Sequence, residues 1–174
     1  MKFGLIGHPV SHSLSKCIHE ANFDAIGIGA TYDLIDLPSL DLTPTKSLLG
    51  YNVTVPYKEA ILTHLDHIDE KATKIGAVNT IMHLWGKSYA TNTDGAGFAK
   101  SLDIPTKNLQ ALVVGAGGTA RSIIYELLEH GATVDVANRT LSKAHQIKEQ
   151  IGSRDVLSLE QAADKVPEYN LIVN

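Results

Sequence analysis

The sequence lacks most of the features that mark specialised protein classes. Its single cysteine, Cys17, excludes an internal disulfide and fits a reducing cytoplasm. No apolar run approaches the length of a transmembrane helix, and the N-terminal MKFGLIGHPV turns polar too early for a signal peptide. The net charge is −4, from 15 Lys and Arg against 19 Asp and Glu, so neither nucleic acid nor a membrane is an expected partner. What remains is an ordinary globular composition, with 44% hydrophobic residues in a chain of 174, enough for one large domain or two small ones.

A predicted βαβ unit organises the chain. Leu112–Val114 is a short continuous apolar run, typical of a parallel strand buried on both faces. A glycine-rich turn follows, and Thr119–Glu129 then carries apolar side chains at helical spacing up to a stop at Gly131. A second apolar strand, Thr133–Ala137, completes the unit.

The glycine-rich turn is typical of a dinucleotide-binding site. Gly115 allows the tight turn out of the strand, and Gly117 lets the backbone approach a pyrophosphate held by the helix N–H groups. Ala120 is small enough for close helix–strand packing. The alternative is a glycine turn in a flavodoxin-like domain that binds no dinucleotide. The candidate cofactor-binding residues of this turn are Gly115, Ala116, Gly117, Gly118, Thr119 and Ala120.

The residues after the second strand favour NADP over NAD. An NAD site usually places Asp or Glu there, about 20 residues past the glycines, to hold the ribose 2′-hydroxyl. This sequence has Asn138, Arg139 and Thr140 instead, with Lys143 one turn farther on, and these side chains suit a 2′-phosphate. Asp135 is the acidic competitor, but it lies in the middle of the strand. In the alternative interpretation Arg139 is only a solvated surface residue.

The N-terminal strand, Lys2–Ile6, leads into a serine-rich helix start. Ser11, Ser13 and Ser15 precede a helix that ends near Gly27. One serine in such a place is usually an N-cap, but three exceed what capping needs. Spare hydroxyls at a helix N-terminus can hold a carboxylate, so both interpretations stay open from the residues alone.

More polar side chains gather at the end of the strand predicted over 51–55. Its period of two places Asn52 and Thr54 on one face, opposite Val55. Lys58 stands at the start of a helix expected through about residue 65. Open α/β sheets bind ligands at such strand ends, so these residues are candidate site residues.

A hairpin of two strands, over 77–84 and 88–93, closes the N-terminal half. Asn79 lies at the start of the first strand, and Asp94 directly follows the second. We expect a domain boundary near Asp94, with a helix over 96–103 as the connector.

These segments together resemble the shikimate dehydrogenase family, and they do so in order and spacing across nearly the whole chain. The motifs are SHSLS at Ser11–Ser15, NVTVPYK at Asn52–Lys58, GAVNT at Gly76–Thr80, NTDG at Asn92–Gly95, GAGGTAR at Gly115–Arg121 and NRT at Asn138–Thr140. The resemblance implies a reversible, NADP-dependent reduction of 3-dehydroshikimate to shikimate in aromatic amino-acid biosynthesis.

The resemblance also implies roles for individual residues. Ser13 and Ser15 match the serines that hold the substrate carboxylate, and Lys58 and Asp94 match the catalytic pair. Arg139 and Lys143 fall where the family grips the 2′-phosphate. The positions that match contacts to the ring hydroxyls are Asn52, Thr54, Asn79 and Asp94. The chain departs from the family at His8, usually Asn, and at Lys16, usually Pro; Lys16 adds a positive charge beside the expected carboxylate site.

Two rival functions remain open. A quinate/shikimate dehydrogenase preferring NAD would share most of these motifs, although Asn138, Arg139 and Thr140 argue against it. The chain could also be a non-catalytic module that binds NADP or shikimate, although the intact Lys58 and Asp94 argue against that. No metal site is expected, and the protein is expected to be a monomer or a homodimer.

The predicted fold class is α/β: an N-terminal α/β substrate domain over 1–94, followed over 95–174 by a truncated Rossmann-type dinucleotide-binding domain. A doubly wound dinucleotide domain normally has about six strands. Only four are predicted here, and the fourth, at 171–174, should lie beside the first. We therefore expect a fragment of a longer enzyme that turns over poorly.

Overall fold

The computed structural model describes all 174 residues. The chain divides into two compact units. The first contains Met1–Ala72 and Val78–Thr91, and the second contains Thr73–Ala77 and Asn92–Asn174. Each unit has its own sheet and its own hydrophobic core, so each is described separately.

The first unit is built on a mixed sheet of six strands in the order β2-β1-β3-β5-β6-β4. Its elements are β1 (Lys2–Gly7), α1 (Ser15–Ala25), β2 (Thr31–Asp36), η1 (Thr43–Ser47), β3 (Gly50–Val53), η2 (Ala60–His64), β4 (His67–Ile68), α2 (Glu70–Ile75, shared with the second unit), β5 (Thr80–Leu84) and β6 (Lys87–Thr91). Strands β1, β2 and β3 are parallel, whereas β5 runs antiparallel to both β3 and β6. The carboxyl ends of β1, β3 and β6 and the start of β5 therefore meet at one edge of this sheet.

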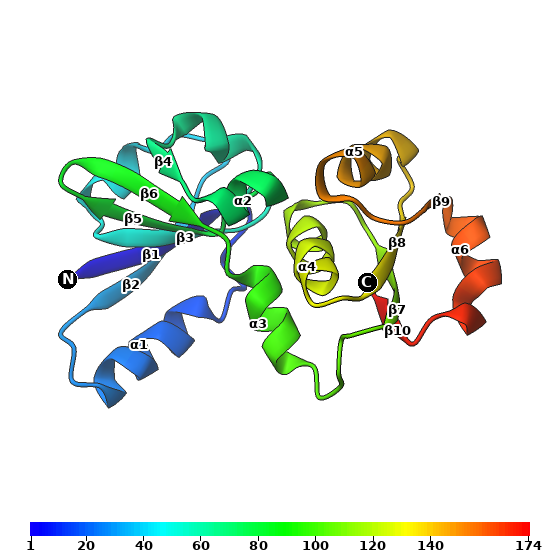
Figure 1. Cartoon of the computed structure of the whole chain (residues 1–174). Coiled ribbons are helices and arrows are strands. Elements are labelled where there is room, and N and C mark those ends of the chain that lie inside the picture. The colour runs from blue at the N-terminus through cyan, green and yellow to red at the C-terminus, as the bar shows by residue number, and fades with distance from the viewer. The chain divides into compact units, whose positions relative to one another are not determined.

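The two faces of this sheet bury different side chains. On one face Val53, Ile6 and Ile81 belong to the larger core, which the 3₁₀ turn η2 covers through Ile61. On the other face α1 packs over β1 and β2, where Leu5 and other side chains form a smaller cluster (Figure 1). The alternation follows from the two-residue period of a strand.

The expected end of β3 and the expected position of Lys58 at a helix start were wrong. Strand β3 ends at Val53 and not at residue 55, and Val55 is 66% exposed. The chain turns there, because the Tyr57 N–H donates to the Thr54 carbonyl and Pro56 has no N–H for the sheet. Lys58 consequently lies in a turn before η2 and not at the start of a helix. The sequence patterns also missed β4 and α2, which are short.

The second unit has four parallel strands in the order β10-β7-β8-β9. Its elements are α3 (Asp94–Ser101), β7 (Gln110–Val114), α4 (Gly118–Glu129), β8 (Thr133–Ala137), α5 (Leu141–Ile151), β9 (Val156–Leu157), α6 (Leu159–Lys165), η3 (Val166–Glu168) and β10 (Leu171–Val173). Helices α4 and α5 pack on one face and α6 on the other (Figure 1). The expected α/β class is confirmed, and the last strand lies beside the first of this unit, as predicted.

No helix of the structure combines the length and the apolar character that crossing a membrane requires.

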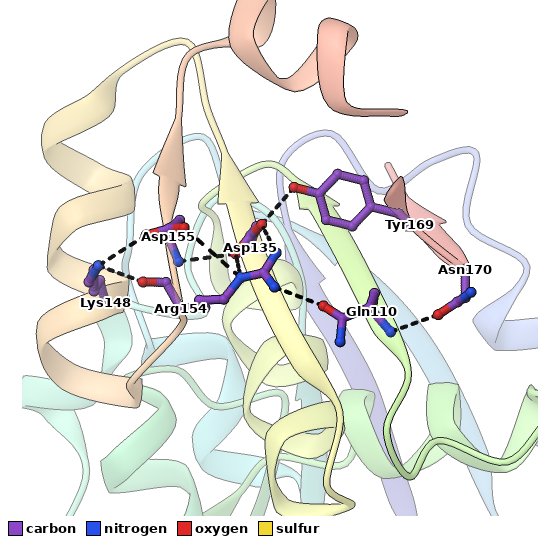
Figure 2. Close-up of polar contacts among 7 residues, drawn as sticks. All are labelled: Gln110, Asp135, Lys148, Arg154, Asp155, Tyr169 and Asn170. Carbon is purple, nitrogen blue, oxygen red and sulfur yellow. Dashed lines mark hydrogen bonds and ion pairs between the residues drawn. The ribbon is translucent and has the colours of Figure 1, made fainter. Parts of the chain in front are cut away.

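A buried carboxylate joins the strands of the second unit (Figure 2). Asp135 of β8 is fully buried and accepts a forked pair of hydrogen bonds from Arg154, with Nε at 2.8 Å from Oδ1 and Nη2 at 2.5 Å from Oδ2. The Tyr169 hydroxyl, just before β10, donates to Oδ2 at 2.6 Å. Arg154 also reaches Gln110 of β7, through Nη1 at 2.8 Å. The Asp135–Arg154 pair thus links segments in or next to all four strands.

These contacts set the protonation state of the cluster. Burial alone would raise the pKa of Asp135, but the hydrogen bonds from Arg154 and Tyr169 outweigh it and hold the pKa below its ordinary value. Burial and the bond to Asp135 raise the pKa of Tyr169 to about 12, so its hydroxyl remains a donor at neutral pH. Asp135 is therefore an ionised acceptor whose lone pairs are occupied within the fold.

We predict that Asp135→Asn lowers the free energy of unfolding by about 1–3 kcal/mol at pH 7, because it replaces the charged acceptor of a buried network. A carboxyl whose pKa is lower in the folded state stabilises the fold above its unfolded pKa, and this contribution is lost as the pH falls through the folded pKa. The difference between wild type and variant should be constant above about pH 5 and shrink at lower pH. Urea titrations at several pH values measure it.

Asp155→Asn is the matched control, because it removes one negative charge from a residue adjacent to the Asp135–Arg154 pair. The Asp155 side chain is half exposed, and it lies 3.7 Å from Lys148 Nζ and 4.0 Å from Arg154 Nε. Exposed pairs of this kind contribute about 0–1 kcal/mol. Equal effects of the two substitutions would show that Asp135 has no special role in stability.

Candidate active site

A pocket of about 600 Å³ opens at the carboxyl edge of the first unit's sheet. It lies where the loop after β1, the start of α1 and the chain after β3 come together. Its lining residues are Leu5, His8, Pro9, Val10, His12, Ser13, Leu14, Ser15, Thr54 and Val55. Three of the predicted site residues, Ser13, Ser15 and Thr54, are thus brought together. A second hollow of about 480 Å³, over β4, β5 and β6, contains none of them.

The two pocket serines, Ser13 and Ser15, are hydrogen-bonded to each other, and neither is the N-cap residue of α1. The Ser15 N–H donates to Ser13 Oγ at 3.2 Å, and the Ser13 hydroxyl donates to Ser15 Oγ at 3.0 Å. The N-cap residue of α1 is Leu14, which offers no side-chain cap. This chain of donors leaves the Ser15 hydroxyl proton to be given to a ligand, and a carboxylate at a helix N-terminus is a favourable acceptor.

Asn52 and Asn79 are held together beside this pocket. The Asn52 amide donates to the Asn79 carbonyl and to Thr80 Oγ1, each at 3.1 Å, and its Oδ1 accepts from the Tyr32 hydroxyl at 2.7 Å. Thr80 in turn donates to Asn79 Oδ1 at 2.9 Å. The antiparallel pairing of β3 with β5 places Asn52 opposite Thr80 and so produces this network. Asn79 is 8% exposed, so its orientation is fixed by packing.

Lys58 is half buried in the turn that follows β3. Its carbonyl accepts a hydrogen bond from the Val78 N–H at 2.9 Å, which ties the turn to the residue before Asn79. The backbone of the expected catalytic lysine is therefore fixed by the same segment that carries Asn79.

The two departures from the family pattern find local partners. His8 Nδ1 donates to Asp36 Oδ1 at 3.1 Å, which leaves Nε2 for other partners. Lys16 Nζ lies 3.4 Å from both Glu20 and Asp33. The positive charge that Lys16 adds near the pocket is thus balanced by two carboxylates of the protein.

Asp94 begins α3 in the second unit, and buried neighbours fix it there. Its N–H donates to Asn92 Oδ1 at 3.0 Å, and the Asn92 amide donates to the Ala77 carbonyl at 2.9 Å. Gly95 then lies against α4, so closely that a Cβ atom there would stand 2.2 Å from the Ser122 carbonyl oxygen. The aspartate is therefore attached to the helix that follows the glycine-rich turn.

The glycine-rich turn has the geometry that the sequence predicted. Gly115 follows β7 with a φ of +130°, and its N–H donates to the Ala137 carbonyl at 2.8 Å. Gly117 is the N-cap of α4, whose first turn carries no acidic residue. The N–H groups of Gly118 and Thr119 at this helix start suit a phosphate.

The turn after β8 lies next to the glycine-rich turn, because Val114 pairs with Ala137 in the sheet. Asn138 holds this turn closed by donating to the Thr140 carbonyl at 2.8 Å. Arg139 is exposed and has no acceptor within the chain. Lys143 is exposed as well, in the first turn of α5, which has no acidic residue.

Both halves of the chain match known families over most of their length. Residues 5–81 match the shikimate dehydrogenase substrate binding domain, and residues 98–174 match the shikimate/quinate 5-dehydrogenase family. A relative from Staphylococcus aureus named shikimate dehydrogenase (NADP(+)) is 38% identical over 184 residues, which cover 100% of this chain and 68% of the relative. The chain belongs to the shikimate dehydrogenase family.

Solved structures of the shikimate dehydrogenase family share this fold. The enzyme from Aquifex aeolicus superposes with a TM-score of 0.90 at 36% identity, over 100% of this chain and 68% of its own. The Thermus thermophilus enzyme in complex with NADP(H) and shikimate gives 0.89 at 38% identity, over 100% of this chain and 67% of its own.

The sequence patterns missed three residues that position the site. Tyr32 orients Asn52, Asn92 orients Asp94, and Arg121 holds the segment before Val78. Asn92 and Arg121 stood inside recognised motifs, and their burial, 2% and 5% exposed, is what separates them from ordinary polar surface residues. Tyr32 gave no local signal, because its partner is 20 residues away in sequence.

We predict that Gly95→Ala destabilises the second unit by about 1–3 kcal/mol, because the added methyl collides with the Ser122 carbonyl and forces α3 from α4. Gly97→Ala is the control in the same helix, since nothing lies within 4 Å of its added methyl. It should be neutral or stabilise the helix by up to about 1 kcal/mol. Thermal unfolding compares the two variants, and equal melting temperatures would refute the close packing of α3 on α4.

Proposed function

We propose that this protein interconverts 3-dehydroshikimate and shikimate with NADP as the redox partner. The observation that carries the proposal is the serine pocket at the carboxyl edge of the first unit, with Thr54 in its wall and the Asn52–Asn79 network beside it. A carboxylate acceptor and several hydroxyls are what this combination of donors and acceptors recognises. The Thermus thermophilus relative, described in complex with NADP(H) and shikimate, supports the proposal.

The substrate contacts follow from the hydrogen-bonding groups of each side chain. Ser13 and Ser15 hold the carboxylate, with Ser15 as the donor. Thr54 and Asn79 meet ring hydroxyls. Asn52 already spends both amide hydrogens and one lone pair inside the protein, so its contact with a hydroxyl uses the second lone pair of Oδ1.

The proton is handled by Lys58 and Asp94. Reduction of the ring carbonyl needs a proton at the oxygen, and oxidation of the alcohol needs its removal, so a group close to this oxygen must exchange a proton near neutral pH. Either an ammonium or a carboxyl can do so, while the other orients the hydroxyl by a charged hydrogen bond. The bound nicotinamide supplies or accepts the hydride.

The second unit fits NADP. The start of α4 offers backbone N–H groups to the pyrophosphate, and Arg139 and Lys143 offer positive charge to the 2′-phosphate. Asn138 and Thr140 complete the turn around it. Asp135, the one acid that could have favoured NAD, is committed to Arg154 and Tyr169.

We accordingly assign substrate binding to the N-terminal domain, 1–94, and NADP binding to 95–174, in a protein that works in the cytoplasm as a monomer or homodimer. The chain crosses between the two units at 77/78, within GAVNT, and at 91/92, directly before NTDG, and both motifs carry proposed substrate residues. This assignment is supported because the glycine-rich turn and Arg139 lie in the second unit, whereas the first unit carries Ser13, Ser15, Asn52, Thr54 and Asn79.

The deciding experiment follows the absorbance of reduced cofactor when the purified protein meets shikimate. Formation of NADPH with shikimate, and much less NADH, supports the proposal. Preference for NAD with quinate supports the rival dehydrogenase. Binding of both ligands by calorimetry without turnover supports a non-catalytic module.

We predict that Arg139→Ala weakens NADP binding by about 1–3 kcal/mol, the scale of a lost charged hydrogen bond. NAD lacks the 2′-phosphate, so its affinity should hardly change and serves as the internal control. Fluorescence titration measures both. An equal loss of affinity for NADP and NAD would show that Arg139 does not bind the 2′-phosphate.

We predict that Lys58→Ala lowers kcat about 10²–10⁴-fold and changes KM for shikimate much less, because it removes general acid–base help. Lys87→Ala, at the exposed start of β6, is the control and should behave as wild type. A near-normal kcat with a raised KM would make Lys58 a binding residue only.

A further inference from the structure

Arg121 is a buried cation beside a solvent-facing loop. It stands in the first turn of α4, directly after the glycine-rich turn, yet it is only 5% exposed. A buried guanidinium must be satisfied by acceptors, because taking its charge out of water is costly. The hydrogen-bond partners of the Arg121 guanidinium therefore indicate which segments it holds in place.

The guanidinium reaches the short segment Thr73–Ala77. Arg121 Nε donates to the Ile75 carbonyl at 2.6 Å, and Nη2 donates to Gln150 Oε1 of α5. At Gly76, where φ is +71°, a Cβ atom would stand 2.8 Å from Nη2. Arg121 thus clamps the backbone of this segment between α4 and α5.

The clamped segment runs straight into the proposed substrate residues. The next residue, Val78, donates to the Lys58 carbonyl at 2.9 Å. Asn79 follows, with its N–H on the Thr91 carbonyl at 3.1 Å and its carbonyl accepting from Val53 at 2.9 Å. Only Ala77 and Val78 separate Gly76 from Asn79 in the chain, and Val78 is hydrogen-bonded to Lys58.

The other end of the clamp lies at the proposed cofactor site. The Arg121 N–H donates to the Gly117 carbonyl at 3.0 Å, so the residue belongs to the first turn of α4, where a helix N-terminus suits a pyrophosphate. A phosphate that fixes this turn also fixes the root of the Arg121 side chain. Lysine could not replace it, because an ammonium lacks the planar fork that reaches two acceptors in different directions.

We propose that Arg121 is a positioning residue that couples the two ligands: occupation of the glycine-rich turn holds Ile75 and Gly76 more firmly through Arg121 and thereby strengthens substrate binding at Asn79 and Lys58. This inference rests on the proposed function. The coupling is reciprocal, so substrate strengthens cofactor binding by the same factor. Couplings of this kind are typically about 5–150-fold.

The test measures the dissociation constant of shikimate by calorimetry, with and without saturating NADPH. Shikimate and NADPH are both reduced, so the ternary complex does not turn over. The wild type should bind shikimate at least about 5-fold more tightly with NADPH present. Arg121→Met should bring this ratio close to 1 and leave the affinity for NADPH alone within about 3-fold, and Arg121→Lys should restore little of it. A merely structural residue would lower the melting temperature and leave the ratio unchanged.

Gly76→Ala tests the same clamp from the other side, and Gly86→Ala is its matched control. Both glycines have positive φ, +71° and +75°, so the backbone strain is similar. Only at Gly76 would the new methyl meet Arg121, since nothing lies within 4 Å of one at Gly86. Gly76→Ala should reduce the ratio, and Gly86→Ala should leave it at the wild-type value.

The outcomes separate the inference from the function on which it rests. Wild-type protein that binds neither shikimate nor NADPH overturns the proposed function and the coupling together. Wild-type protein that binds both with a ratio near 1, or with a ratio that Arg121→Lys and Gly76→Ala leave intact, overturns the coupling alone. If Arg121→Met does not fold, these two milder variants decide the question.

Discussion

The alignment of strand ends is the constraint on which both proposed sites depend. In the first unit β1 and β3 are parallel and β5 is antiparallel to β3, so the ends of two strands and the start of a third share one edge. In the second unit β7 and β8 are parallel, so the glycine-rich turn and the Asn138–Thr140 turn share an edge too. Backbone hydrogen bonding alone therefore gathers residues that lie far apart in sequence.

Buried polar side chains fix the positions of the site residues that meet at these sheet edges. Tyr32 and Asn92 each bond to a proposed site residue, Arg121 bonds to the segment that leads to Asn79, and each of the three is at most 5% exposed. A buried donor left without an acceptor is costly, so each of these side chains holds its segment in one arrangement.

In the second unit, different residues stabilise the fold and determine the proposed cofactor preference. Asp135 stands two positions before the end of β8, but its carboxylate is buried under Arg154 and Tyr169 on the α6 side of the sheet (Figure 2). The turn beyond β8 is left with exposed cations. A single strand thus carries a stabilising acid in its middle and leads into a phosphate-compatible turn at its end.

The sequence by itself determined the α/β class, most strands and helices, and the candidate residues, because apolar periodicity and glycine-rich turns are local properties. Strand β8 was predicted residue for residue, and β10 was correctly placed beside β7. Periodicity failed at Val55 and Lys58, where a turn closed by Thr54 and Tyr57 interrupts the pattern, and at the two-residue strand β4, which is too short to show a period. Only the tertiary structure decided that Lys16 is paired with carboxylates, that Asp135 is hydrogen-bonded to Arg154, and that Arg121 holds the segment before Asn79. The contacts are Lys16 with Asp33, Asp135 with Arg154, and Arg121 with Ile75, and the partners are at least 17 residues apart in sequence. Local sequence patterns cannot predict contacts between residues so far apart.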